Sequence, residues 1–288
     1  MEMRRYVTMA LVSFVLITGL AALGGLLHGK GESCDPAEGD EQVIPAIEEG
    51  PAFSKDMTYI RDIPLPLDEA MEQHLTEFRT KAKELMLKYP DSFFISLPTN
   101  EKVVALTFDD GPDAYTTREI VEILDRFQVP ATFFFIGNQI SRNPGSARLV
   151  IESGHLAANH SWSHLRPTDI DTGKCISEVT AAESAIAGIT SACRLYRPPY
   201  GLVTEAQMAA LEEAGYKVFA WSVDSMDWYF DDPDDIVRCV VERVHPGAIV
   251  LLHCAGGRNN RRATIEALPQ IITELKDMGY SFVALDRY

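Results

Sequence analysis

Residues 103–112 read VVALTFDDGP, an apolar run broken only by Thr107 that ends in Asp109 and Asp110. The run has the composition of a buried strand, and the Gly-Pro pair at 111–112 turns the chain sharply after it. Two adjacent carboxylates at a strand end repel each other, which costs stability unless an arginine or a metal ion compensates. This segment therefore predicts a strand that carries a charged site at its carboxyl end.

The same alternation of short apolar runs and amphipathic stretches continues to the C-terminus. Apolar runs predict further strands at 131–136, 156–158, 194–196, 218–221, 248–252 and 282–285. Amphipathic stretches predict helices at 117–127, 146–153, 173–187, 204–214, 233–243 and 262–278. Strands that alternate with helices form βαβ units with parallel pairing. Residues 99–288 are therefore expected to form one α/β domain, a distorted (β/α)7-type barrel, with an open doubly wound sheet as the alternative.

The chain before this domain divides into three parts. Two arginines precede a charge-free apolar run that ends at residue 27, which at about 1.5 Å per residue is long enough to cross a bilayer core. The basic flank predicts a cytoplasmic N-terminus, so residues 1–27 are expected to anchor an extracytoplasmic domain; a cleaved signal peptide is the alternative. Residues 28–66 are rich in carboxylates and are expected to form an acidic linker. Residues 67–98 are expected to be a lead-in that contains an amphipathic helix over 68–89.

Composition and charge exclude two broad classes of protein. The 288 residues carry a formal net charge of −16, and no stripe of Lys and Arg interrupts this excess, so a nucleic-acid partner is not expected. A hydrophobic content of 46% supplies a real core, which excludes wholesale disorder. The five cysteines are odd in number and form no Cys-x-x-Cys pair, so neither a disulfide framework nor a zinc knuckle is indicated.

Strong polar residues follow the carboxyl ends of the predicted strands. The first strand ends in two aspartates, and the others are followed by His160 and His164, by RPPYG at 197–201, by Asp224 and Asp227, and by His253. Active sites of parallel α/β folds lie at this end of the strands. Two imidazoles and one carboxylate make a three-ligand metal site that leaves a position for water, which is the arrangement of hydrolytic rather than structural zinc. His74, His155 and His245 are expected to be structural.

Five motifs along the domain resemble those of a known family. They are TFDDGP (107–112), HSWSH (160–164), RPPYG (197–201), DSMDW (224–228) and LLH (251–253). In this order they are similar to the motifs of the polysaccharide deacetylase family, the NodB-homology or carbohydrate esterase family 4 enzymes. The resemblance extends from residue 102 to 288 and implies a distorted barrel, a divalent metal and removal of acetyl groups from N-acetylated sugars.

The resemblance implies roles for the residues of the first three motifs. Asp110, His160 and His164 correspond to the metal ligands, with zinc as the expected ion and cobalt or another divalent ion as alternatives. Asp109 corresponds to the general base that takes a proton from the metal-bound water. Arg197 would hold Asp109 ionised and oriented, because a nearby cation favours the carboxylate.

The later motifs supply the acid and the pocket. The backbone N–H of Tyr200 would stabilise the oxyanion together with the metal. His253 corresponds to the general acid for the leaving amine, with Asp227 raising its pKa and fixing its tautomer. Leu251 and Trp228 would shape the pocket for the acetyl methyl group and the sugar face.

A membrane-tethered extracytoplasmic deacetylase is expected to act on the surrounding cell wall, and peptidoglycan amino sugars are the expected substrate. Chitin oligosaccharides and acetylated xylan remain alternatives. A wall-binding module that holds a glycan without cleaving it would not need Asp109, His253 or a metal, all of which the motifs supply. Hydrolysis of small amides on the same fold is a further alternative, against which the membrane anchor counts.

Overall fold

Strand β2 (Val103–Asp109) lies in the middle of the sheet that positions the site. In the computed structural model, which describes residues 60–191 and 193–287, every residue of β2 is buried. Val104, Leu106 and Phe108 join the core beneath the surrounding helices, whereas alternate residues face the other side of the sheet. Thr107 and Asp109 therefore point into the interior of the curled sheet.

The sheet is parallel and curled. Its strands are β1 (Phe93–Phe94), β2, β3 (Thr132–Phe135), β4 (Leu156–Asn159), β5 (Leu195–Tyr196), β6 (Lys217–Phe219), β7 (Val223–Asp224), β8 (Ala248–His253) and β9 (Ser281–Phe282). They pair in the order β1-β6-β5-β4-β3-β2-β8-β7, with β9 on β2, and every pair of strands is parallel. The predicted parallel α/β architecture is confirmed, but the path of paired strands in the described residues does not close. β1 and β7 were not predicted, because β1 falls in the expected helical lead-in and β7 lies after the apolar run that ends at residue 221.

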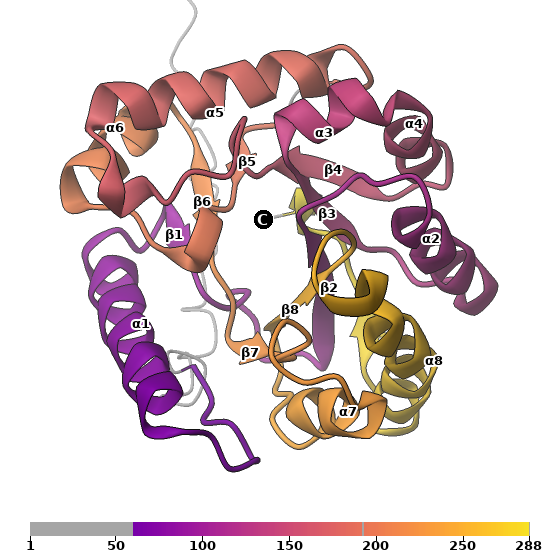
Figure 1. Cartoon of the computed structure of the whole chain (residues 1–288). Coiled ribbons are helices and arrows are strands. Elements are labelled where there is room, and N and C mark those ends of the chain that lie inside the picture. Colours follow the sequence, from indigo (N-terminus) through magenta and orange to yellow (C-terminus); the bar gives the residue numbers. More distant parts are fainter. Residues whose placement is uncertain (1–59, 192, 288) are drawn as a thin grey trace, which may run out of the picture. The chain divides into compact units, whose positions relative to one another are not determined.

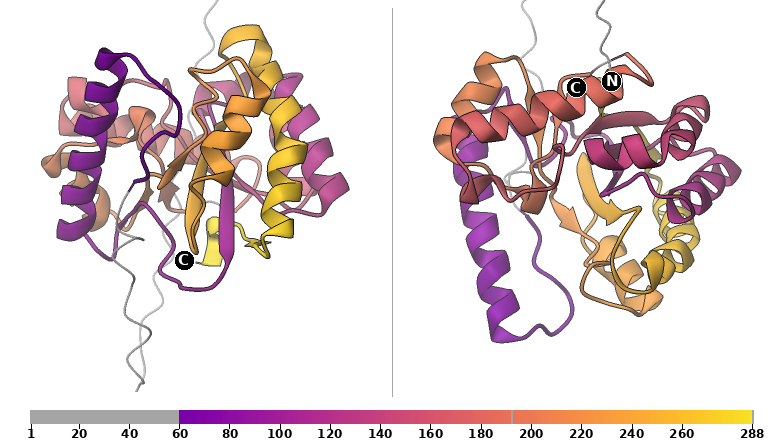
Figure 2. Two further views of the ribbon diagram at one scale, coloured as in Figure 1. Left: turned by 90° about the horizontal axis from the view of Figure 1, so that it is seen from below. Right: turned by 45° about the horizontal axis from the view of Figure 1, so that its top comes forward.

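Helices cover the outside of this curled sheet (Figures 1 and 2). They are α1 (Glu69–Lys88), α2 (Thr116–Phe127), α3 (Gly137–Arg142), α4 (Pro144–Glu152), α5 (Thr172–Ala187), α6 (Glu205–Glu213), α7 (Pro233–Val241) and α8 (Arg262–Asp277). Short 3-10 turns occur at Pro167–Asp169, Pro199–Gly201, Arg258–Arg261 and Leu285–Arg287. All but α3 and these short turns were predicted, because longer helices carry a clear apolar periodicity.

Helix α1 covers the side on which the sheet stays open, between β1 and β7 (Figure 1). Its N-terminus is capped by the side chain of Asp68, which accepts a hydrogen bond from the backbone N–H of Met71. Phe78 stacks on Trp221 with ring centroids 4.6 Å apart. Leu75 packs in one cluster with Met226, beyond β7. The helix thus contacts both sides of the opening and takes the place of a closing strand pair.

The predicted membrane anchor and most of the predicted acidic linker lie outside the described residues. No helix within residues 60–191 and 193–287 is long and apolar enough to cross a membrane. Four cysteines of this part of the chain, Cys175, Cys193, Cys239 and Cys254, are free thiols.

Candidate active site

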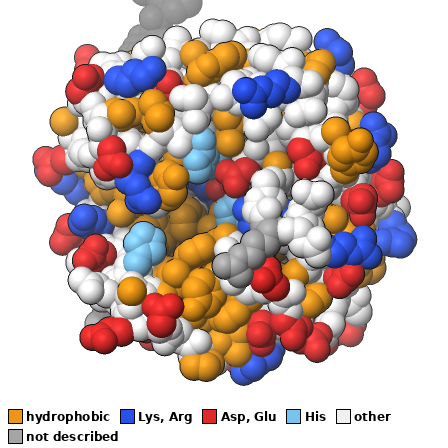
Figure 3. All heavy atoms as spheres, viewed as in Figure 1, with side chains coloured by type: hydrophobic (Ala, Val, Ile, Leu, Met, Phe, Trp, Pro, Cys, Tyr) orange, Lys and Arg blue, Asp and Glu red, His pale blue; other side chains and the backbone are white. Residues whose placement is uncertain are grey.

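A cavity of about 410 Å³ opens where the parallel strands end. Figure 3 shows this face, with a hollow that has hydrophobic side chains along its walls and histidine and acidic side chains at its centre. The residues that line the cavity are Met71, His74, Leu75, Phe78, Asp109, Asp110, His160, His164, Arg166, Tyr200, Trp221, Asp224, Trp228, Leu251, His253 and Arg261. Predicted site residues from five strand ends thus meet in one cavity, as the strand-end argument requires.

Asp110, His160 and His164 form a cluster whose ligand atoms lie within 4.8 Å of one another. Asp110 Oδ1 is 3.2 Å from Nε2 of His164 and 3.7 Å from Nε2 of His160. Strand alternation alone would point Asp109 and Asp110 to opposite faces. Asp110 has a φ of 74°, so the chain turns at the strand end and both carboxylates reach the same cavity.

Hydrogen bonds orient the two histidines, and they leave one ring nitrogen of His160 free to bind a metal ion. Nδ1 of His160 lies 2.7 Å from the carbonyl oxygen of Arg197, to which it donates, and this leaves the lone pair on Nε2. Burial lowers the pKa of His160 to about 4, so the ring is neutral at pH 7. The backbone N–H of His164 donates to Oγ of Ser161, and Glu178 on α5 accepts from both N and Oγ of Ser163. These bonds fix the turn between the histidines.

Asp109 and Arg197 form a buried ion pair beside this cluster. Nη1 of Arg197 lies 2.8 Å from Oδ1 of Asp109 and 2.8 Å from Oγ1 of Thr107. The other guanidinium nitrogens donate to the carbonyl oxygens of Phe219 and Ala220. Burial lowers the pKa of Arg197, and the nearby Asp109 carboxylate opposes this by raising it. Every nitrogen of the guanidinium has a hydrogen-bond partner. The arginine therefore fixes the Asp109 carboxylate and balances its charge.

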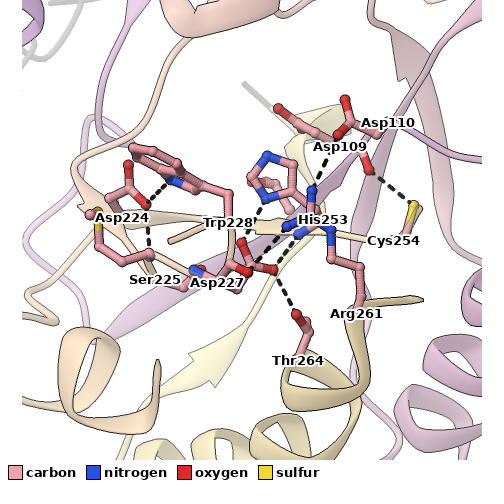
Figure 4. A network of polar contacts seen from close by, with 12 residues as sticks. Asp109, Asp110, Asp224, Ser225, Asp227, Trp228, His253, Cys254, Arg261 and Thr264 are labelled. Carbon is pink, nitrogen blue, oxygen red and sulfur yellow. Dashed lines mark hydrogen bonds and ion pairs between the residues drawn. The ribbon is translucent and has the colours of Figure 1, made fainter. Parts of the chain in front are cut away.

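His253, which lines the same cavity, forms a second pair with Asp227. Nδ1 of His253 lies 2.7 Å from Oδ1 of Asp227, whose Oδ2 accepts from the backbone N–H of His253 and from Oγ1 of Thr264 on α8. Figure 4 shows Thr264 and Arg261 reaching the pair from the C-terminal helix and the turn before it. Burial alone lowers the pKa of His253, but the Asp227 carboxylate outweighs it and raises the pKa to about 9. The ring is therefore protonated at neutral pH.

The three residues predicted to bind substrate also lie around the cavity. Tyr200 has a φ of 61° and is 48% exposed, and its ring centroid lies 5.1 Å from that of His164. Trp228 is half-buried and donates from Nε1 to Oδ1 of Asp224 (Figure 4). Leu251 is buried at the end of β8. An exposed aromatic ring, a fixed indole and an apolar side chain thus surround the polar centre.

Several lining residues were not predicted. Arg261 is buried, with Nη2 3.6 Å from Oδ2 of Asp110 and Nη1 donating to the carbonyl oxygen of Asp227. No strand precedes it directly, so the strand-end argument could not find it. The prediction that His74 is structural was wrong, because this exposed residue of α1 lines the cavity. Trp221 is buried against Phe78 and also lines the cavity.

The fold and the cavity define a class of protein, a curled parallel α/β half-barrel with pairs of charged residues at the strand ends. Residues 96–219 match the family described as polysaccharide deacetylase. The chain is similar to a peptidoglycan-N-acetylglucosamine deacetylase of Bacillus cereus, at 37% identity over 66% of this chain and 89% of the relative. It is 36% identical to a chitooligosaccharide deacetylase of Bradyrhizobium over 62% of this chain and 86% of that one. It is 35% identical to PgdA of Listeria monocytogenes, a peptidoglycan-N-acetylglucosamine deacetylase, over 65% of this chain but only 39% of that longer one.

A solved structure agrees with these sequence relatives. The Bc1960 peptidoglycan N-acetylglucosamine deacetylase aligns with a TM-score of 0.65 and 32% identity, over 67% of this chain and 90% of that one. The chain therefore belongs to the polysaccharide deacetylase family, the NodB-homology or carbohydrate esterase family 4 enzymes. It is a hydrolase that acts on linear amides of a polysaccharide.

Proposed function

We propose that this protein is a metal-dependent deacetylase that removes N-acetyl groups from the amino sugars of peptidoglycan. The observation that carries the proposal is the meeting of two ion pairs, Asp109 with Arg197 and Asp227 with His253, with the Asp110–His160–His164 cluster at one cavity. Each pair suits one half of an amide hydrolysis, which needs a base for the incoming water and an acid for the leaving amine.

The residues of the cluster fit a divalent metal ion. One carboxylate and two imidazoles are the donor set of hydrolytic zinc, and three protein ligands leave a coordination position for substrate or water. The bond from Nδ1 of His160 to the Arg197 carbonyl leaves Nε2 as its ligand atom. When bound, such an ion acts as a Lewis acid and lowers the pKa of the water it binds to about 7. Zinc is the proposed ion, with cobalt or another divalent ion able to use the same donors.

Asp109 is proposed as the general base. Its Oδ1 is occupied by Arg197, while Oδ2 lies 3.7 Å from Nε2 of His160, so this oxygen is the one nearest the cluster. A water molecule that attacks an acetyl carbonyl held at the cluster would give its proton to this oxygen. The backbone N–H of Tyr200 is proposed to stabilise the charge that develops on the carbonyl oxygen.

His253 is proposed as the general acid. Asp227 holds Nδ1, so Nε2 is the atom from which His253 would donate a proton to the leaving amine. Departure as an amine completes cleavage of the carbon–nitrogen bond. Leu251 is proposed to contact the acetyl methyl group, and Trp228 to contact the sugar.

Peptidoglycan is proposed as the substrate because relatives with 33–37% identity carry that specificity in their names. The similarity to a chitooligosaccharide deacetylase makes N-acetylglucosamine oligomers the second candidate. The apolar run over residues 6–27 supports a further proposal, that the enzyme is anchored in the cell membrane with its catalytic domain outside.

The test is acetate release by the metal-loaded protein from peptidoglycan, N-acetylglucosamine oligomers and acetylxylan, each with and without chelator. We expect chelator-sensitive release, fastest from peptidoglycan. Faster release from the oligomers would select the second candidate. No release from any of the three by folded, metal-loaded protein would refute the proposed activity and favour a glycan-binding role.

A further inference from the structure

A second, smaller hollow of about 130 Å³ lies beside the active-site cavity. Four residues line both of them, namely His74, Phe78, Arg166 and Tyr200. One wall of the hollow is α1, and the opposite wall is formed by the turns that follow β4 and β5. α1 lies outside residues 96–219, so this wall is not part of the segment that defines the family. A glycan that reaches the metal cluster with one sugar can place a neighbouring group here.

Arg166 is the most distinctive side chain of this hollow. Its guanidinium carbon lies 3.7 Å from the centroid of the Tyr200 ring, and the His164 ring lies 5.1 Å from Tyr200 in a tilted arrangement. Arginine stacked on an aromatic ring keeps its donors in a fixed plane, so less entropy is lost when a ligand binds. Its contact with Asp169 is long, at 3.9 Å, and that carboxylate is 71% exposed. The guanidinium is therefore oriented yet only weakly paired.

The charge around the hollow is unlike that of the whole chain. The protein has a formal net charge of −16, but among the described residues that line the hollow Lys81 and Arg166 are cationic and Glu77 is the single carboxylate. Lys81 is exposed on the same helix as His74. A local excess of cations next to a polar site favours an anionic group on the ligand.

The wall formed by α1 is rigid enough to hold such a group. Phe78 is 5% exposed and stacks on Trp221 beneath the hollow. Gly201 has a φ of 81°, and a Cβ there would lie 2.6 Å from both Phe78 and Trp221. At Gly201 the turn after β5 is thus packed directly against α1, at the edge of the hollow.

We propose that this hollow, with Arg166 as its main contact and Lys81 in support, is a subsite for a carboxylate carried by the sugar next to the one that is deacetylated. The guanidinium fork matches a carboxylate with two parallel hydrogen bonds. The lactyl group of a muramic acid residue is such a carboxylate where no stem peptide is attached to it. The inference rests on the proposed function for the position of the neighbouring sugar, and it adds a preference for acidic over neutral glycans.

The test compares two tetrasaccharides of equal length that differ only in acidic groups. One alternates N-acetylglucosamine with N-acetylmuramic acid bearing free lactyl carboxylates, and the other is tetra-N-acetylchitotetraose. Their Kd values are measured by calorimetry with the full chain in chelator, which prevents turnover. We expect the wild type to bind the acidic glycan about tenfold more tightly, Arg166→Gln to lose this preference, and Arg166→Lys to keep part of it.

Arg194→Gln is the matched control, because Arg194 is exposed and lies over a tyrosine ring, Tyr216, away from both cavities. It should retain the wild-type preference. Equal affinity of the wild type for the two glycans, or a preference that survives Arg166→Gln, overturns the subsite. Acetate release from the same glycans with metal separates the two proposals: a preference that depends on Arg166 without any acetate release would support the subsite and refute the deacetylase activity.

Discussion

Nη1 of Arg197 lies 2.8 Å from Oδ1 of Asp109, and neither residue is more than 3% exposed. The two residues come from β2 and from the end of β5, which are separated in the sheet by two strands. The guanidinium spans the interior of the curled sheet and also lies 4.1 Å from the ring centroid of Phe134. The same side chain therefore holds the proposed base and fills the space between the strands.

Replacing Arg197 by lysine should damage both stability and activity. Lysine cannot reproduce a planar fork that serves Asp109, Thr107 and two backbone carbonyls at once. We expect a loss of about 3–5 kcal/mol in the free energy of unfolding, measured by urea titration, and a fall in kcat of about a hundredfold. A variant with wild-type kcat would show that Arg197 does not orient the base.

Substitutions of Asp109 and His160 should differ in their effect on metal binding, although both should reduce turnover. Asp109→Asn removes the proposed base but no ligand, so the variant should bind one metal ion and lose kcat by at least about a hundredfold. His160→Ala removes a ligand and should lose both. Metal stoichiometry of the purified folded variants, beside acetate release, checks this. Loss of the metal in Asp109→Asn would place Asp109 among the ligands instead.

The Asp227–His253 pair should set the alkaline limit of activity. The pKa of His253 is raised to about 9, so the acid form persists at neutral pH and kcat should fall as the pH rises through about 9. In Asp227→Asn burial still lowers the pKa of His253, but no carboxylate at position 227 raises it. The alkaline limit should therefore move down by more than two pH units. The same shift has a sign for stability: the charged pair stabilises the fold fully below pH 6.5, the ordinary pKa of histidine, and this contribution is lost as the pH rises through about 9.

An unchanged alkaline limit in folded Asp227→Asn would exclude His253 as its source. Thr264→Val is a milder companion, because it removes one hydrogen bond to Oδ2 of Asp227 and leaves the carboxylate charge. Its pH profile should shift in the same direction by a smaller amount.

The role of His253 as an acid predicts a dependence on the leaving group. An amine leaves poorly without a proton, whereas an activated phenol ester leaves without help. His253→Gln should therefore slow release from an N-acetyl sugar by about a hundredfold or more and slow hydrolysis of an activated acetate ester much less. Equal losses on both substrates would indicate that His253 acts before the leaving group departs.

Most of the sheet could be predicted from the sequence because its strands fall in short apolar runs, and three of them, β2, β4 and β8, end in or next to Asp109, His160 and His253. Their parallel pairing then brings the ends together, so Asp109, His160 and His253 were expected at one rim before any contact was known. β1 was missed because its two phenylalanines follow shortly after a helical pattern, and β7 because the pair Val223-Asp224 contains a single apolar residue.

The rest of the site depends on packing that no local pattern encodes. Arg261 reaches Asp110 from a turn of left-handed residues after β8, and no strand end marks it. Helix α1 was predicted as an amphipathic helix, but an apolar pattern does not predict which part of the sheet the helix covers. His74 was taken as structural for this reason, although it lines the cavity.

Helix α1 should therefore contribute to substrate binding as well as to stability, and Phe78→Ala tests both. Loss of a buried ring that stacks on Trp221 should lower the free energy of unfolding by about 3–5 kcal/mol. Because Phe78 lines both cavities, KM for glycan oligomers should rise severalfold while the alkaline limit set by His253 stays in place. Leu87→Ala is the control on the same helix, since Leu87 is 66% exposed and lines neither of these cavities. If Phe78→Ala matched Leu87→Ala in both urea unfolding and KM, α1 would be no more than a cover for the open side of the sheet.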